Sequence, residues 1–124
     1  MNMEITKVYR FEAAHSLPLL PSTHKCHNLH GHSYEILVAV KGPLTRPLLW
    51  VQDYADISAV VKPLIERLDH KNLNEVLATY CTTAENLALW FAEELKEKLP
   101  LLSRIEVRET QTSNVILLIE RTDD

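Results

Sequence analysis

The stretch from Cys26 to His32, Cys-His-Asn-Leu-His-Gly-His, constrains the fold of this chain more than any other. It carries one thiol and three imidazoles within seven residues. Alternate side chains of an extended strand lie on one face, so an extended backbone here would place His30 and His32 on the same face. Two such imidazoles can bind one zinc ion, but a catalytic zinc needs three protein ligands and an open position. The fold must therefore bring a third ligand to this strand, and we expect it to be His15, at the end of another apolar segment.

A His-x-His pair alone is weak evidence for a metal site, because histidines are common on protein surfaces. Two further features strengthen the hypothesis: Cys26 lies in the same cluster, and an Asp69-His70 pair later in the chain resembles a second catalytic element. A lone cysteine is more often a small buried apolar residue than a nucleophile. The hypothesis therefore depends on the residues taken together.

Composition excludes several classes of function. At 124 residues, with 46% hydrophobic and 24% charged residues, we expect one soluble globular domain over 1–124. Lys and Arg form no clustered run, so no nucleic-acid-binding surface is predicted. No apolar stretch is long enough to span a bilayer, and the first residues lack the layout of a signal peptide, so we expect a cytoplasmic protein without a membrane partner. The two cysteines are then expected to be free thiols. Only two glycines are present, which excludes glycine-rich phosphate-binding loops.

The apolar periodicity predicts strands and helices in the order strand, strand, helix, helix, strand, strand. Alternation and β-branched residues predict strands over 3–14 and 33–41, joined by a loop that delivers Cys26, with 48–52 as a further extension of the pairing. Helical spacing of apolar residues predicts a helix from Ile57 to Leu68, with Asp53 or Asp56 as its N-cap and Pro63 kinking or breaking it.

The second half of the chain begins with an irregular stretch over 71–80. Thr82 and Glu85 have the spacing of a capping box, so we expect Thr82 to begin a second helix, with Leu99 on its inner face and Pro100 ending it. Strands over 103–112 and 115–121 then form a hairpin around a turn at 112–114.

Five segments, in the right order over nearly the whole chain, resemble the 6-pyruvoyltetrahydropterin synthase family. The Cys-x-x-x-His-Gly-His spacing is most similar to that of its bacterial branch, the 6-carboxy-5,6,7,8-tetrahydropterin synthases of queuosine biosynthesis. The segments are Phe-Glu-Ala-Ala-His over 11–15, Cys-x-x-x-His-Gly-His over 26–32, Leu-Asp-His-Lys-Asn-Leu-Asn over 68–74, Thr-Ala-Glu-Asn over 83–86 and Glu-Thr over 109–110.

The resemblance implies a site for zinc, for proton transfer and for the pterin ring. The matching residues are His15, His30 and His32 as zinc ligands, Cys26 as catalytic cysteine with Asp69 and His70 as its partners, and Glu109 with Thr83 as pterin contacts.

The fold implied by the resemblance is the α+β tunnelling fold, with a four-stranded antiparallel sheet and two helices. In this fold three subunits close their sheets into a β-barrel and two trimers stack into a homohexamer. Active sites lie between subunits, so Cys26 and His70 need not meet within one chain. The sequence departs from the family pattern at Leu49, where glycine is usual, and at Thr82, where many members have proline.

The implied reaction converts 7,8-dihydroneopterin triphosphate to 6-carboxy-5,6,7,8-tetrahydropterin with loss of acetaldehyde and triphosphate. The alternative is a 6-pyruvoyltetrahydropterin synthase, which eliminates triphosphate and keeps all side-chain carbons. Side-chain cleavage for folate synthesis usually accompanies a glutamate near position 26, where this chain has Cys26. A pterin- or zinc-binding module without turnover would not need Cys26, Asp69 and His70. A hydrolytic metalloenzyme lacks support because there is no His-Glu-x-x-His helix.

Overall fold

Two long strands, β1 (Asn2–His15) and β2 (His30–Pro43), form the centre of the computed structural model, which describes residues 1–120. They pair antiparallel over their whole length, from Asn2 opposite Pro43 to His15 opposite His30. Side chains alternate between a buried and a more exposed face, as the period-two pattern predicts. Both predicted strands are confirmed, and both extend further toward the histidines.

The sheet has five strands in the order β3-β1-β2-β4-β5. β4 (Leu102–Thr110) and β5 (Ser113–Leu118) form the predicted hairpin, although it turns at 111–112, and the predicted end of its second strand at Arg121 lies outside the described residues. β3 (Lys71–Asn72) lies parallel to β1. The α+β class is confirmed, but the expected four-stranded antiparallel sheet is wrong, because a two-residue strand is too short to show any periodicity.

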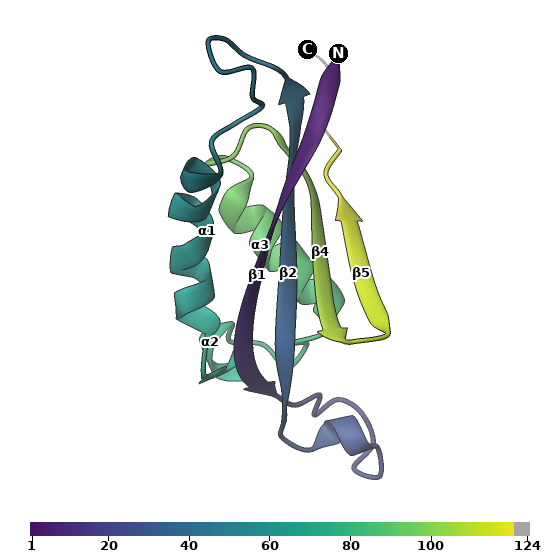
Figure 1. The fold of residues 1–124 in the computed structure, drawn as a ribbon. Helices are drawn as coiled ribbons and strands as arrows, with labels where there is room; N and C mark the ends of the chain where they lie inside the picture. The colour runs from purple at the N-terminus through teal and green to yellow at the C-terminus, as the bar shows by residue number, and fades with distance from the viewer. Residues whose placement is uncertain (121–124) are drawn as a thin grey trace.

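Three α-helices cover one face of the sheet (Figure 1). They are α1 (Tyr54–Leu68), α2 (Leu73–Val76) and α3 (Ala84–Leu95), and a short 3-10 helix, η1 (Lys25–His27), lies in the loop between β1 and β2. The two long helices were predicted, and α2 was missed because four residues carry no helical stripe. Their buried apolar side chains pack on the inner face of the sheet and form the core together with Phe11, Tyr34, Ile36, Val38, Ile105 and Val107.

The structure identifies the N-cap of α1. Asp53 is the N-cap, because its carboxylate accepts a hydrogen bond from the backbone N–H of Ala55 at 2.9 Å. The helix continues through Pro63, so the expected break does not occur. Pro63 and Ala59, four residues earlier, both lie on the exposed face, where water can bind the carbonyl that loses its helical partner.

The predicted boundaries of the second helix are wrong at both ends. Thr83, not Thr82, caps α3 and accepts a hydrogen bond from the N–H of Asn86 at 3.2 Å. Thr82 is fully buried instead. The helix ends at Leu95 and continues as a turn that still buries Leu99. The stretch over 48–52 adds no strand, since only an isolated bridge between Thr45 and Trp50 forms there.

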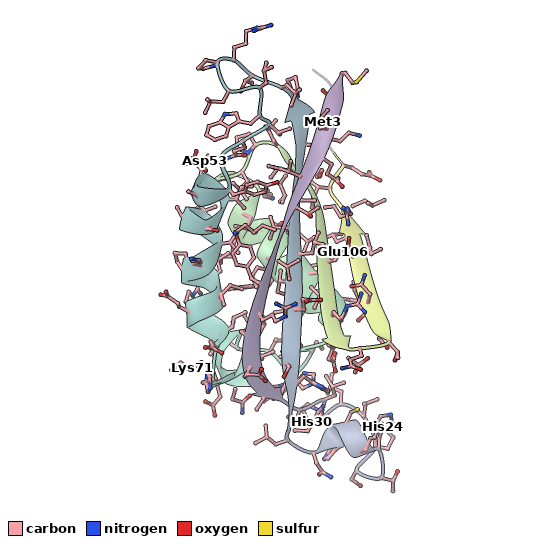
Figure 2. All side chains as sticks on the ribbon, in the orientation of Figure 1. Met3, His24, His30, Asp53, Lys71 and Glu106 are labelled. Carbon is pink, nitrogen blue, oxygen red and sulfur yellow. The ribbon has the colours of Figure 1, made fainter. Side chains whose placement is uncertain are left out.

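The two ends of the sheet differ in chemistry. His30 and Lys71 lie at one end with His24 in the loop beyond, whereas Asp53 lies toward the other end (Figure 2). The carboxyl ends of β1 and β4 and the amino end of β2 therefore meet where the predicted site residues lie. Among residues 1–120, none of the helices has the length and apolar character needed to cross a membrane.

Candidate metal centre and active site

The pairing of β1 with β2 brings three histidines together on the helix-covered face. His15 lies directly opposite His30, and the small Ala13 lies opposite His32. The imidazole centroids are 4.6 Å apart for His15 and His30, 5.1 Å for His15 and His32, and 4.9 Å for His30 and His32. The strand register thus places the predicted ligand rings side by side.

Backbone carbonyls orient two of these rings. The Nδ1–H of His15 donates to the carbonyl of Thr82 at 2.8 Å, and the Nδ1–H of His30 donates to the carbonyl of Asn28 at 2.7 Å. Because a carbonyl can only accept, Nδ1 carries the hydrogen in both rings and Nε2 keeps a free lone pair. Among residues 1–120, the Nε2 atoms of His15, His30 and His32 are buried without a hydrogen-bond partner. Buried polar atoms are rarely left unpaired, so three such atoms facing one another fit a metal ion.

Glu109, at the end of β4, completes this group. Its Oε1 lies 2.8 Å from Nε2 of His32 and 3.6 Å from Nε2 of His15, and neither contact is a hydrogen bond. One ligand atom from each of the four residues can be chosen so that all lie within 4.8 Å of one another. Three imidazole nitrogens and a carboxylate oxygen are ligands that zinc accepts.

Electrostatics shift the pKa of two members of this group, Glu109 and His32. Contact with His15 and the nearby charge of His32 hold the pKa of the Glu109 carboxyl below its ordinary value. Burial lowers the pKa of His32, although the Glu109 carboxylate opposes this shift. An ionised carboxylate and neutral imidazoles can both donate lone pairs to a cation.

A second group, Asp69 and His70, lies just after α1. Asp69 Oδ1 lies 3.0 Å from His70 Nδ1 and accepts a hydrogen bond from the N–H of Glu12 at 2.9 Å. The N–H of His70 donates to the carbonyl of Glu12 at 2.6 Å. The Glu12 N–H, with a smaller effect of His70, keeps the pKa of the Asp69 carboxyl below its ordinary value. Asp69 is therefore an anion that orients an exposed imidazole.

One hollow of about 510 Å³ is lined by His32 of the first group and by His70 of the second. Glu109 borders two other hollows of about 360 and 310 Å³. Thr83 lies at the start of α3, next to Ala84, which lines the smaller of these two. The site residues thus surround concave surface at one end of the sheet.

Cys26 lies outside the metal group. It is half-buried in η1, and its N–H donates to Nδ1 of His24 at 3.0 Å. Within residues 1–120, the group that could hold a metal does not include Cys26. One chain therefore brings His15, His30, His32 and Glu109 together, and does not bring Cys26 to them.

Comparisons with known proteins show which family this chain belongs to. The profile of the family described as 6-pyruvoyl tetrahydropterin synthase matches residues 4–119. The chain belongs to this family. Among its relatives, 6-carboxy-5,6,7,8-tetrahydropterin synthase of Synechocystis is 37% identical over 88% of each chain. Dihydroneopterin monophosphate aldolase of Pyrococcus furiosus is 33% identical over 79% of this chain and 81% of its own.

The fold of this chain is also that of a solved tetrahydropterin synthase structure. The 6-pyruvoyl tetrahydropterin synthase of Caenorhabditis elegans superposes with a TM-score of 0.87, at 26% identity over 97% of each chain. The family resemblance expected from the motifs is thereby confirmed.

Three residues around the candidate site were not predicted from the sequence. Glu12 contacts Asp69 and His70 through its backbone, which no side-chain pattern reveals. Thr82 was assigned to helix capping, yet it contacts His15. Asn74 belongs to the family-like segment over 68–74, but the sequence indicated no role for it. In the structure its amide lies between Ser16 and the loop that carries Thr82.

Proposed function

We propose that this member of the family is a zinc-dependent lyase, folded as one domain over 1–124. It converts 7,8-dihydroneopterin triphosphate and water to 6-carboxy-5,6,7,8-tetrahydropterin, acetaldehyde and triphosphate, in queuosine synthesis. The observation that carries the proposal is the set of three buried histidine Nε2 atoms without a hydrogen-bond partner. His32, one of these histidines, lines the same hollow as His70. The similarity to the Synechocystis enzyme supports the choice of product.

His15, His30 and His32 would hold the zinc ion, which supplies Lewis-acid polarisation of a side-chain oxygen of the substrate when bound. The chain's part is to orient the imidazoles toward the ion. The carbonyls of Thr82 and Asn28 do this for His15 and His30 by fixing the hydrogen on Nδ1.

Proton transfer is assigned to Cys26, Asp69 and His70. Cys26 would move protons at the side-chain carbons as a thiolate, and His70 would exchange a proton with the substrate oxygen. The Asp69 carboxylate, 3.0 Å from Nδ1, orients the His70 ring. Because active sites lie between subunits in the fold that the resemblance implies, we propose that a neighbouring subunit supplies Cys26 or His70.

Pterin binding is assigned to Glu109 and Thr83. A carboxylate can accept two parallel hydrogen bonds from the amidine edge of a pterin, as it does from an arginine. Glu109 borders two hollows next to the histidines, which suits this contact. Thr83 would contribute a backbone contact at the start of α3.

The homohexamer implied by the resemblance is supported by the open edges of the sheet. In the part of the chain that the structure describes, β5 has a neighbour on one side only, and β3 covers only Ala13 and Ala14 of β1. Unpaired strand edges invite pairing with another chain. A molar mass near six subunits by light scattering would support the assembly, and a monomer would contradict both the barrel and the shared active site.

Two other products are tested by the same experiment. The similarity to the 6-pyruvoyl tetrahydrobiopterin synthases of Drosophila and human favours triphosphate elimination alone, and the archaeal aldolase favours cleavage between the first two side-chain carbons. The residues of the site would also serve triphosphate elimination, whereas Cys26 stands where a glutamate usually accompanies side-chain cleavage.

The experiment is product analysis. Zinc-loaded protein is incubated with 7,8-dihydroneopterin triphosphate, and separately with the monophosphate, and the pterins and aldehydes are identified by mass spectrometry. Acetaldehyde with a 6-carboxy product supports the proposal. A 6-pyruvoyl product without acetaldehyde, or a 6-hydroxymethyl product with a two-carbon phosphorylated aldehyde, would replace it.

A further inference from the structure

The imidazole of His15 is held more completely than the other two. It is 1% exposed, and its Nδ1 lies 2.8 Å from the carbonyl and 3.1 Å from Oγ1 of Thr82. Thr82 Oγ1 donates to the carbonyl of Ser16 at 3.3 Å, which leaves its lone pairs for the Nδ1–H of His15. One buried residue therefore offers two acceptors to the same ring hydrogen.

Asn74 connects the strand that carries His15 with the loop that carries Thr82. Its Oδ1 accepts from the N–H of Ser16 at 2.9 Å, and its Nδ2 donates to the carbonyl of Ser16, also at 2.9 Å. The same Nδ2 reaches the carbonyl of Thr79 at 3.2 Å, and Oδ1 lies 3.5 Å from Thr82 Oγ1. The Asn74 amide thus contacts Ser16, which follows His15, and also Thr79 and Thr82 in the loop that offers acceptors to His15.

The short helix α2 keeps this amide in place. Asn72 caps α2 by accepting a hydrogen bond from the N–H of Asn74 at 3.0 Å, and the buried Leu73 anchors the helix in the core. Neither Asn74 nor Thr82 lines the hollow shared by His32 and His70. Both act on the metal group only through His15.

We propose that Asn74 and Thr82 are positioning residues of the metal centre, which fix the Nδ1–H form of His15 and aim its Nε2 at the metal. The inference rests on the proposed zinc binding. Partners of a ligating histidine set its tautomer and ring orientation, and their loss typically weakens metal binding by about 10–100-fold.

The test measures zinc affinity by competition with a chromophoric chelator, together with the visible d–d spectrum of the cobalt-substituted protein. Asn74→Ala removes the whole amide, and Thr82→Val removes only the hydroxyl while keeping the shape and the carbonyl. Asn86→Ala is the matched control, because its Nδ2 also donates to a loop carbonyl, that of Cys81 at 2.7 Å, without contacting His15. Circular dichroism verifies that each variant is folded.

We expect zinc affinity to fall by about 10–100-fold in Asn74→Ala and by less in Thr82→Val, with altered cobalt bands in both. Thr82→Ser restores the hydroxyl and is expected to restore affinity, and Asn86→Ala is expected to match the wild type. If Asn74→Ala does not fold, Thr82→Val decides. Wild-type affinity and spectrum in folded variants would overturn the inference, as would an equal loss in Asn86→Ala. Failure of the wild-type protein itself to bind zinc would instead contradict the proposed function.

Discussion

His15 and His30 each use one ring nitrogen for the protein and leave the other for a ligand. This division could be predicted only in part from the sequence. The His-x-His spacing places two imidazoles on one face, and His15 was assigned as third partner, but the carbonyls that orient the rings belong to Thr82 and Asn28. Any residue has a carbonyl, so residue types carry no information about this contact.

Cys26 provides the sharpest residue-scale prediction. Because its thiol lies outside the metal group, Cys26→Ala is expected to leave zinc affinity unchanged while the turnover rate falls by about 10²–10⁴-fold, as for loss of a proton-transfer group. Steady-state kinetics and chelator competition measure the two effects on the same preparation. Loss of zinc or of folded structure in the variant would show that Cys26 is structural.

At the scale of elements, long periodic segments were predictable and short or boundary features were not. β1, β2 and α1 repeat their pattern over many residues, so their existence follows from periodicity. β3 and α2 together span six residues and are set by tertiary contacts, chiefly the pairing with β1. The N-cap of α3 is one residue later than predicted. Thr82 and Thr83 are both acceptable caps by residue type, but Thr82 is buried against His15 and contacts its ring, so Thr83 caps the helix.

The cap of α1 predicts a stability effect. Asp53→Ala removes the acceptor for the N–H of Ala55 and is expected to destabilise the fold by about 1 kcal/mol. Asp53→Asn keeps an acceptor and is expected to lose much less. Urea unfolding at fixed protein and zinc concentrations measures both variants, and equal midpoints for Asp53→Ala and the wild type would contradict the assignment.

On the face of the sheet that the helices leave open, Glu4 is expected to make the stability of the fold depend on pH. Its carboxylate lies 2.6 Å from Arg104 and accepts from Ser103 at 2.8 Å, and the bond to Arg104 chiefly holds its pKa below the ordinary value of 4.5. The folded form therefore gains stability above pH 4.5 and loses it as the pH falls through the lowered pKa.

Glu4→Gln is accordingly expected to be less stable than the wild type near pH 7 and to approach it as the pH falls through the lowered pKa. The difference should be about 1 kcal/mol or less, since the pair is partly exposed and screened. Thermal unfolding as a function of pH measures it. A difference that grows toward acid pH would show that the sign is wrong.

At the scale of the whole molecule, the metal group ties β1, β2 and β4 at one end of the sheet. Zinc at about 100 times its Kd is expected to stabilise the folded protein by about 2.7 kcal/mol, because it binds the assembled ligands. Thermal unfolding with zinc and with chelator measures the gain. His30→Ala should abolish most of it, and an equal gain in that variant would place the ion elsewhere.

The register of β1 against β2 also bears on how this chain can change in evolution. An inserted residue within β2 between His32 and Ile36 would turn either the histidines or the core side chains to the opposite face, since the strand period is two. An insertion between His15 and Cys26 shifts nothing in the ladder, because that loop stands outside the sheet (Figure 1). Length variation among descendants of this chain is therefore expected to collect in this loop, while the two strands change only by substitution.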